Sequence, residues 1–109
     1  MAKKTYKLRY LPLFYEDLEE KLLYIAEELQ NPQAANALLD AVEKAIFERL
    51  PDAEKFEKYN SIRERKYPYY RIYVKKFVVY YVVIMDEGNE AIMEVRRFLY
   101  EGQNREERL

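Results

Sequence analysis

The chain has 109 residues, of which 50% are hydrophobic and 36% charged, and a formal net charge of −1. It has no His and no Cys, which excludes a Ser-His-Asp triad, a thiol nucleophile and a Cys-based zinc site. At this length we expect one domain over residues 1–109. The sequence offers neither a bilayer-spanning segment nor a signal peptide, which predicts a cytoplasmic protein without membrane contact.

The first half of the chain predicts one strand and two helices. Residues 5–11 alternate between apolar and polar side chains, which indicates a half-buried strand. Residues 13–30 repeat apolar side chains at helical spacing, with most acids off that stripe. Asn31-Pro32 is typical of a helix start, and Pro51 ends the second helix. We expect the two helices to pack as an antiparallel hairpin, because their joint is short.

The second half predicts three strands after a long polar connection. In chain order we expect the connection at 52–68, strands at 69–74, 77–85 and 90–99, a hairpin turn at 86–89 and a polar tail at 101–109. Residues 77–85 are apolar on both faces, which is typical of a central strand. The order β-α-α-β-β-β predicts an α+β fold, in which the helix hairpin packs on one face of a small, mostly antiparallel sheet.

The near-zero net charge averages over segments of opposite sign. Residues 1–10 carry +4 and residues 58–85 carry +6, whereas residues 11–57 carry −8 and residues 86–109 carry −3. The helices are therefore acidic and the strands basic. On the sheet face away from the helices we expect either a solvated charged face or a nucleic-acid-binding surface with tyrosines between the bases. Its basic members are Lys7, Arg9, Arg71, Lys75 and Lys76, with Arg63, Arg65 and Lys66 near the rim.

The element order and several short motifs resemble the RelE/ParE family of toxins from type II toxin–antitoxin systems. The similarity covers about residues 6–104. Its motifs are Phe14-Tyr15-Glu16-Asp17-Leu18, Tyr24-Ile25, Asn31-Pro32-Gln33-Ala34-Ala35, Tyr70-Arg71-Ile72-Tyr73-Val74, Tyr80-Tyr81-Val82-Val83 and Val95-Arg96-Arg97-Phe98-Leu99-Tyr100. The resemblance implies a growth-inhibiting toxin that a cognate antitoxin neutralises. RelE-like members cut mRNA in the ribosome without a metal, and ParE-like members poison DNA gyrase.

The sequence departs from the RelE-like nucleases at two positions. Val78 stands where those relatives often carry an Arg at the start of the central strand, and Leu99 stands where the YoeB-like branch has His in its final motif. The Arg and Tyr of that final motif are present as Arg97 and Tyr100. The resemblance therefore leaves both targets open, as well as a non-catalytic binding module derived from a degenerate toxin.

Metal-free RNA cleavage requires a base, an acid and cations for the phosphorane charge, and no cofactor. Without His, the candidate catalytic residues are Tyr100 as acid or positioning group and Arg97 and Arg71 as a phosphate clamp, with Glu94 or Glu101 as further carboxylates. A structural role is open for each. Tyr100 would then cap the core, Arg71 would be a surface base, and Arg97 would pair with a helix carboxylate such as Glu20 or Glu28.

Overall fold

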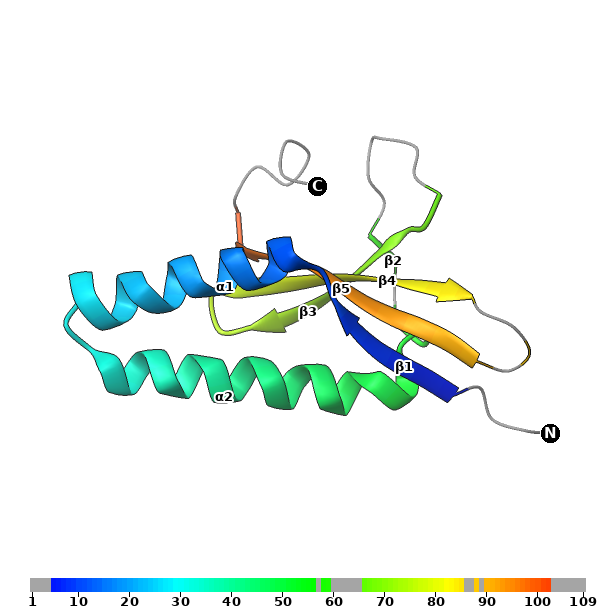
Figure 1. The fold of residues 1–109 in the computed structure, drawn as a ribbon, viewed down its shortest axis with the longest axis horizontal. Helices are drawn as coiled ribbons and strands as arrows, with labels where there is room; N and C mark the ends of the chain where they lie inside the picture. The colour runs from blue at the N-terminus through cyan, green and yellow to red at the C-terminus, as the bar shows by residue number, and fades with distance from the viewer. Residues whose placement is uncertain (1–4, 57, 60–65, 86–87, 89, 103–109) are drawn as a thin grey trace.

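The computed structural model describes residues 5–56, 58–59, 66–85, 88 and 90–102. Two helices lie on one side of a mixed sheet, and the hairpin that they form runs alongside the strands (Figure 1). The elements are β1 (Thr5–Tyr10), α1 (Pro12–Leu23), the π-helical turn η1 (Tyr24–Glu28), α2 (Pro32–Arg49), the 3-10 turn η2 (Leu50–Asp52), β2 (Lys58–Tyr59), β3 (Tyr69–Val74), β4 (Phe77–Met85) and β5 (Glu90–Tyr100). The predicted α+β fold class is confirmed.

The helix boundaries follow local sequence signals. α1 begins at Pro12, whose missing N–H costs nothing in a first helical turn. The predicted single helix over 13–30 differs from the structure, because its last turn widens into η1 and Gln30 then takes a positive φ of 48°. The side chain of Asn31 accepts a hydrogen bond from the Ala34 N–H at 3.1 Å and caps α2, as the sequence predicts.

The sheet has the strand order β1-β5-β4-β3-β2. β1 pairs with β5 in parallel, and the other neighbours are antiparallel. β2 was not predicted, because it is a two-residue strand inside the polar connection over 52–68. A register shift follows Tyr80: this residue faces Arg97, whereas Tyr81 faces Val95, so Arg96 is an extra residue in β5.

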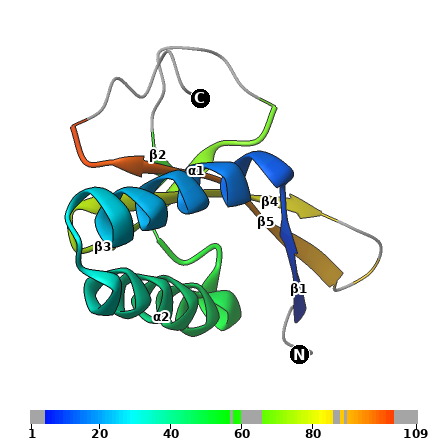
Figure 2. The ribbon, with the colours of Figure 1, turned by 60° about the vertical axis from the view of Figure 1, so that its left-hand side comes forward.

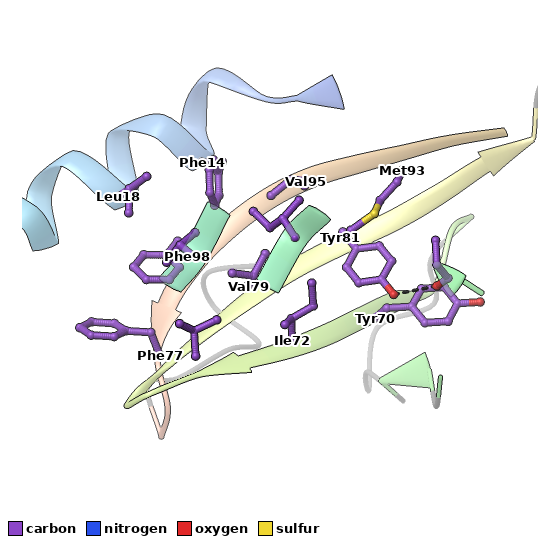
Figure 3. Close-up of a cluster of buried hydrophobic side chains, with 14 of the residues drawn as sticks. Phe14, Leu18, Tyr70, Ile72, Phe77, Val79, Tyr81, Met93, Val95 and Phe98 are labelled. Carbon is purple, nitrogen blue, oxygen red and sulfur yellow. Dashed lines mark hydrogen bonds between the residues drawn. The ribbon is translucent and has the colours of Figure 1, made fainter. Parts of the chain in front are cut away.

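The main core lies between the helices and one sheet face. It is formed by Phe14 and Leu18 of α1, by Leu38, Val42 and Ile46 of α2, and by sheet residues that include Ile72, Val79, Val95 and Phe98 (Figure 3). The strand residues predicted to point inward on β3, namely Tyr70, Ile72 and Val74, are all buried. Figure 2 shows α2 on one side of the sheet, with α1 beside the end of β5.

The sheet face away from the helices differs from the predicted basic surface at its centre. A second cluster of buried apolar side chains occupies it, made of Tyr69, Val78, Tyr80, Val82 and Leu99. The physical reason is that β4 is apolar on both faces, so its outward side chains gather the apolar groups of the neighbouring strands around them. Arg71 is the cross-strand neighbour of Tyr80, so this basic residue lies directly beside the apolar cluster.

Candidate functional site

Arg97, the first predicted catalytic residue, is held in a buried ion pair with Asp17 of α1. Arg97 Nε donates to Asp17 Oδ2 at 2.7 Å, and Arg97 Nη2 donates to Asp17 Oδ1 at 2.9 Å. The side chains of Arg97 and Asp17 are 13% and 11% exposed. Hydrogen bonding to Asp17 raises the pKa of Arg97. The guanidinium therefore pairs with a helix carboxylate, as expected if Arg97 has a structural role. The partner is Asp17, however, and not Glu20 or Glu28.

The same carboxylate also covers the backbone edge of β5. β1 pairs with β5 only as far as Val95, so the following residues of β5 pair with β4 on one side and have no strand on the other side among the described residues. Asp17 Oδ2 accepts the Phe98 N–H at 3.0 Å and satisfies one of these edge groups. Asp17 was not predicted as a site residue. The sequence feature that could have identified Asp17 is its position three residues after Phe14, beside the apolar stripe of the first helix.

Tyr100, the second predicted catalytic residue, ends β5 and is 39% exposed. Its ring stacks at a tilt on Phe77, with centroids 4.8 Å apart, and the ammonium of Lys21 lies 5.3 Å from its centroid. Burial, followed by the nearby Tyr24 and Glu20, raises the pKa of Tyr100 above its ordinary value. The phenol therefore keeps its proton at neutral pH.

Arg71, the third predicted catalytic residue, lies in a cross-strand row with Tyr80 and Arg97. Two strand spacings separate the backbones of the two arginines, or about 10 Å. The guanidinium of Arg71 lies 5.8 Å from the ring centroid of Tyr73. Since Arg97 turns to Asp17 instead, the described contacts do not join the two arginines into the predicted phosphate clamp.

A different arginine, Arg49 of α2, contacts the backbone of β3. Its Nη1 donates to the Arg71 carbonyl at 3.1 Å and to the Tyr81 hydroxyl at 3.0 Å. The hydroxyl of Tyr81 in turn donates to the Ala53 carbonyl at 2.7 Å. Burial raises the pKa of Tyr81, although Arg49 opposes the shift. These contacts anchor η2 to the sheet, a structural role that the sequence did not indicate.

The described members of the predicted nucleic-acid-binding set lie on different elements of the fold. Arg9 pairs with Glu94, which is 4% exposed and also accepts from Arg96 Nε at 2.8 Å. Lys66 lies 5.4 Å from the ring centroid of Tyr67. Lys75 and Lys76 are exposed in the β3–β4 turn, while Arg63 and Arg65 lie outside the described residues.

A groove of about 370 Å³ runs between the two helices, next to the end of β1. Its buried floor includes Phe14, Val42 and Ile46, and its rim includes the exposed rings of Tyr15 and Phe47. The other large exposed apolar side chains of the hairpin are Leu13, Leu23, Tyr24 and Leu29. Exposed apolar surface of this kind is typical of a protein-binding site.

The described part of the chain contains no cluster of three or more acidic side chains placed to hold a metal ion. None of its helices is long and apolar enough to cross a membrane.

The positions at which the sequence departs from RelE-like nucleases lie together in the structure. Val78 of β4 is the direct cross-strand partner of Leu99 of β5, and each is 1% exposed. Both belong to the apolar cluster on the sheet face away from the helices. An apolar, buried pair thus occupies the place of the Arg and the His that the resemblance associates with cleavage.

The chain thus folds as a helix hairpin on a mixed sheet, with an exposed apolar groove between the helices. The profile of the ParE toxin family, described as the ParE toxin of the type II toxin–antitoxin system parDE, matches residues 8–105. The chain therefore belongs to this family of toxins, within the RelE/ParE superfamily. A search of curated proteins gave no match.

Proposed function

We propose that residues 1–109 form one toxin domain that acts in the cytoplasm by binding and poisoning DNA gyrase, without cutting mRNA. The observation that carries this choice is the buried Val78–Leu99 pair. Neither side chain donates a proton, accepts one or carries charge, so this pair supplies nothing to the phosphorane.

The remaining candidate groups are also poorly arranged for RNA cleavage. The guanidinium of Arg97 is engaged by Asp17, and freeing it for a phosphate would leave a buried carboxylate unpaired. The raised pKa of Tyr100 keeps its phenol protonated at neutral pH, so the phenol can act as the acid but leaves the base of the reaction unsupplied. A toxin that works by protein contact requires neither group to react.

The helix hairpin supplies the surface for protein partners. We propose that the cognate antitoxin places apolar side chains in the groove between α1 and α2, whose rim includes Tyr15 and Phe47. Covering these exposed rings would bury apolar area that otherwise faces water, which favours tight binding. The gyrase contact would involve the same hairpin, so antitoxin binding would block it.

The test is tightly induced expression of the full chain in bacteria, together with a supercoiling assay on purified gyrase. We expect DNA breaks, a damage response and loss of supercoiling, with ribosome-bound mRNA intact. Rapid mRNA loss on ribosomes with intact DNA would identify an mRNA endonuclease and refute the proposal. Normal growth without either effect would favour the non-catalytic binding module.

The groove is tested by Phe47→Glu, because a carboxylate on the apolar rim opposes the burial of a partner there. We expect weaker rescue of growth by the co-expressed antitoxin. Lys44→Gln is the matched control, since Lys44 lies exposed on the same helix and is not among the groove residues. Equal rescue of both variants would contradict the proposed antitoxin site.

A further inference from the structure

The groove between α1 and α2 has a wall of three aromatic rings that contact one another. The ring centroid of Tyr10 lies 5.4 Å from that of Phe14 and 5.3 Å from that of Tyr15. Phe14 and Tyr15 lie 5.8 Å apart by the same measure. All three residues line the groove together with Phe47 of α2, whose ring is exposed. Because aromatic rings attract cations as well as apolar groups, this lining suits either kind of side chain.

Glu43 of α2 supplies the charge of this lining. The other residues around the groove are aromatic or aliphatic, and Glu43 is exposed among them. Burial, followed by the nearby Tyr15 and Glu43, raises the pKa of Tyr10 above its ordinary value. The carboxylate of Glu43 therefore lies close to the aromatic wall, where a cation in the groove can contact both.

Two further acids extend the negative charge along the groove. Glu19 follows Tyr15 by one helical turn of α1, and Asp40 precedes Glu43 by about one turn of α2. Both Glu19 and Asp40 are exposed. An acidic partner residue would meet like charges at this place, which opposes binding, whereas a basic one would be attracted.

The cations of the two helices leave Glu43 without a neutralising partner in the hairpin. Lys21 is buried, and Arg49 donates to the backbone of β3. Lys44 is exposed and pairs with Glu48, at 4.0 Å, one turn further along α2. The carboxylate of Glu43 thus keeps its negative charge on the rim of an apolar groove.

We propose that the groove takes a cationic side chain of the antitoxin, which pairs with Glu43 while its stem packs on the aromatic wall. Lys and Arg suit such a place, because their apolar stems bury against rings while the charged end reaches a carboxylate. The inference rests on the antitoxin site of the proposed function and adds the chemistry of its occupant, which is basic as well as apolar. It does not require gyrase to be the target.

The test is calorimetry of the purified full chain with its cognate antitoxin. We expect Glu43→Lys to weaken binding about tenfold or more, because two positive charges then meet in the groove. Glu43→Gln removes the charge and keeps the shape, so binding should weaken by about twofold to fivefold. Glu28→Lys makes the same change of net charge at an exposed residue outside the groove, and it should leave the affinity unchanged.

A charge exchange then identifies the partner residue. Each Lys and Arg of the antitoxin is changed to Glu in turn, and every variant is measured against wild type and Glu43→Lys. One of these changes should weaken binding to the wild-type chain and strengthen binding to Glu43→Lys. If no change restores binding to Glu43→Lys, the proposal is overturned.

The variant Phe47→Glu separates this inference from the antitoxin site on which it rests. Weaker binding in Phe47→Glu but not in Glu43→Lys would keep the antitoxin in the groove and overturn the cationic side chain. Unchanged binding in both variants would overturn the site as well. Unchanged antitoxin binding with loss of gyrase inhibition in Glu43→Lys would assign the groove to gyrase and overturn the inference. Failure of the gyrase assay itself leaves the binding test valid, because calorimetry uses only toxin and antitoxin.

Discussion

Asp17 and Lys21 are two buried charges one helical turn apart on α1, and the structure treats them differently. Asp17 accepts hydrogen bonds from the Arg97 guanidinium and the Phe98 N–H, so both of its carboxylate oxygens have donors. Among the described residues, Lys21 pairs with the exposed carboxylate of Glu20 at 3.6 Å and lies beside the ring of Tyr100. Both residues face the end of β5, where β1 no longer covers the strand edge.

The difference separates a charge held by a buried bidentate partner from a charge held by one exposed partner. A buried carboxylate with a bidentate partner is expensive to expose, so Arg97 is fixed in place. Arg97, a residue of the final family motif, is thus the more firmly held of the two cations.

The largest effect is expected at Asp17. Asp17→Ala leaves the buried Arg97 guanidinium without its carboxylate and the Phe98 N–H without its acceptor, so the free energy of unfolding should fall by about 3 kcal/mol or more. Urea denaturation measures this change. Glu19→Ala, at an exposed position of the same helix, is the control and should change little. Equal stability of both variants would remove the distinction between Asp17 and a surface acid.

A second satisfied buried group, Tyr81, should give a smaller loss. Tyr81→Phe removes the hydroxyl that donates to the Ala53 carbonyl and accepts from Arg49, at a cost of about 1–2 kcal/mol. Thermal or urea unfolding tests it. Tyr73→Phe serves as the comparison because Tyr73 is 54% exposed. A loss as large at Tyr73 as at Tyr81 would contradict the role given to the buried hydroxyl.

The pH dependence of stability tests a third buried charge, Glu94. Burial alone raises the pKa of Glu94, but hydrogen bonds from Arg9 and Arg96 outweigh burial and hold the pKa below its ordinary value. A lowered folded-state pKa stabilises the protein above the unfolded-state pKa, and this contribution is lost as the pH falls through the folded-state pKa.

Stability should therefore fall in acid less steeply in Glu94→Gln than in the wild type. Urea unfolding across the acid range measures the slope. Glu90→Gln is the control on the same strand, since the Glu90 side chain is 50% exposed in its pair with Lys7. Identical slopes in Glu94→Gln and the wild type would refute the assignment.

The smallest effect on stability is expected at Lys21. Lys21→Met removes a buried ammonium that has few hydrogen bonds and keeps its stem, so the free energy of unfolding should change by no more than about 0.5–1 kcal/mol, or rise. The informative quantity is the difference between this change in the free energy of unfolding and the change caused by Asp17→Ala. A loss as large as that of Asp17→Ala would show that Lys21 is a structural charge.

The sequence was sufficient for the elements that depend on periodicity. Tyr70, Ile72 and Val74 alternate and are buried as predicted, and Asn31 caps the second helix. The two-residue β2 gave no periodic signal, because two residues cannot display an alternation. The π-helical turn over Tyr24–Glu28 depends on how the hairpin closes, which helical spacing alone does not specify.

The candidate site was less predictable, because its contacts join residues far apart in the chain. Arg97 was selected from a motif, but its partner Asp17 lies eighty residues earlier and is one of many helix acids. Spacing alone did not separate Asp17 from Glu20 or Glu28. The pairing of Val78 with Leu99 also required the register of β4 on β5, which the bulge at Arg96 shifts.

The central claim is that Arg97 is structural and not catalytic, and a charge-free replacement of its ion pair tests this directly. Asp17→Asn combined with Arg97→Met keeps an acceptor for the Phe98 N–H and removes both buried charges, which proteins often tolerate. Growth arrest on induction, at matched levels of folded protein, is the measurement. We predict that the double variant arrests growth as the wild type does. A folded, equally abundant double variant that leaves growth normal would contradict the claim.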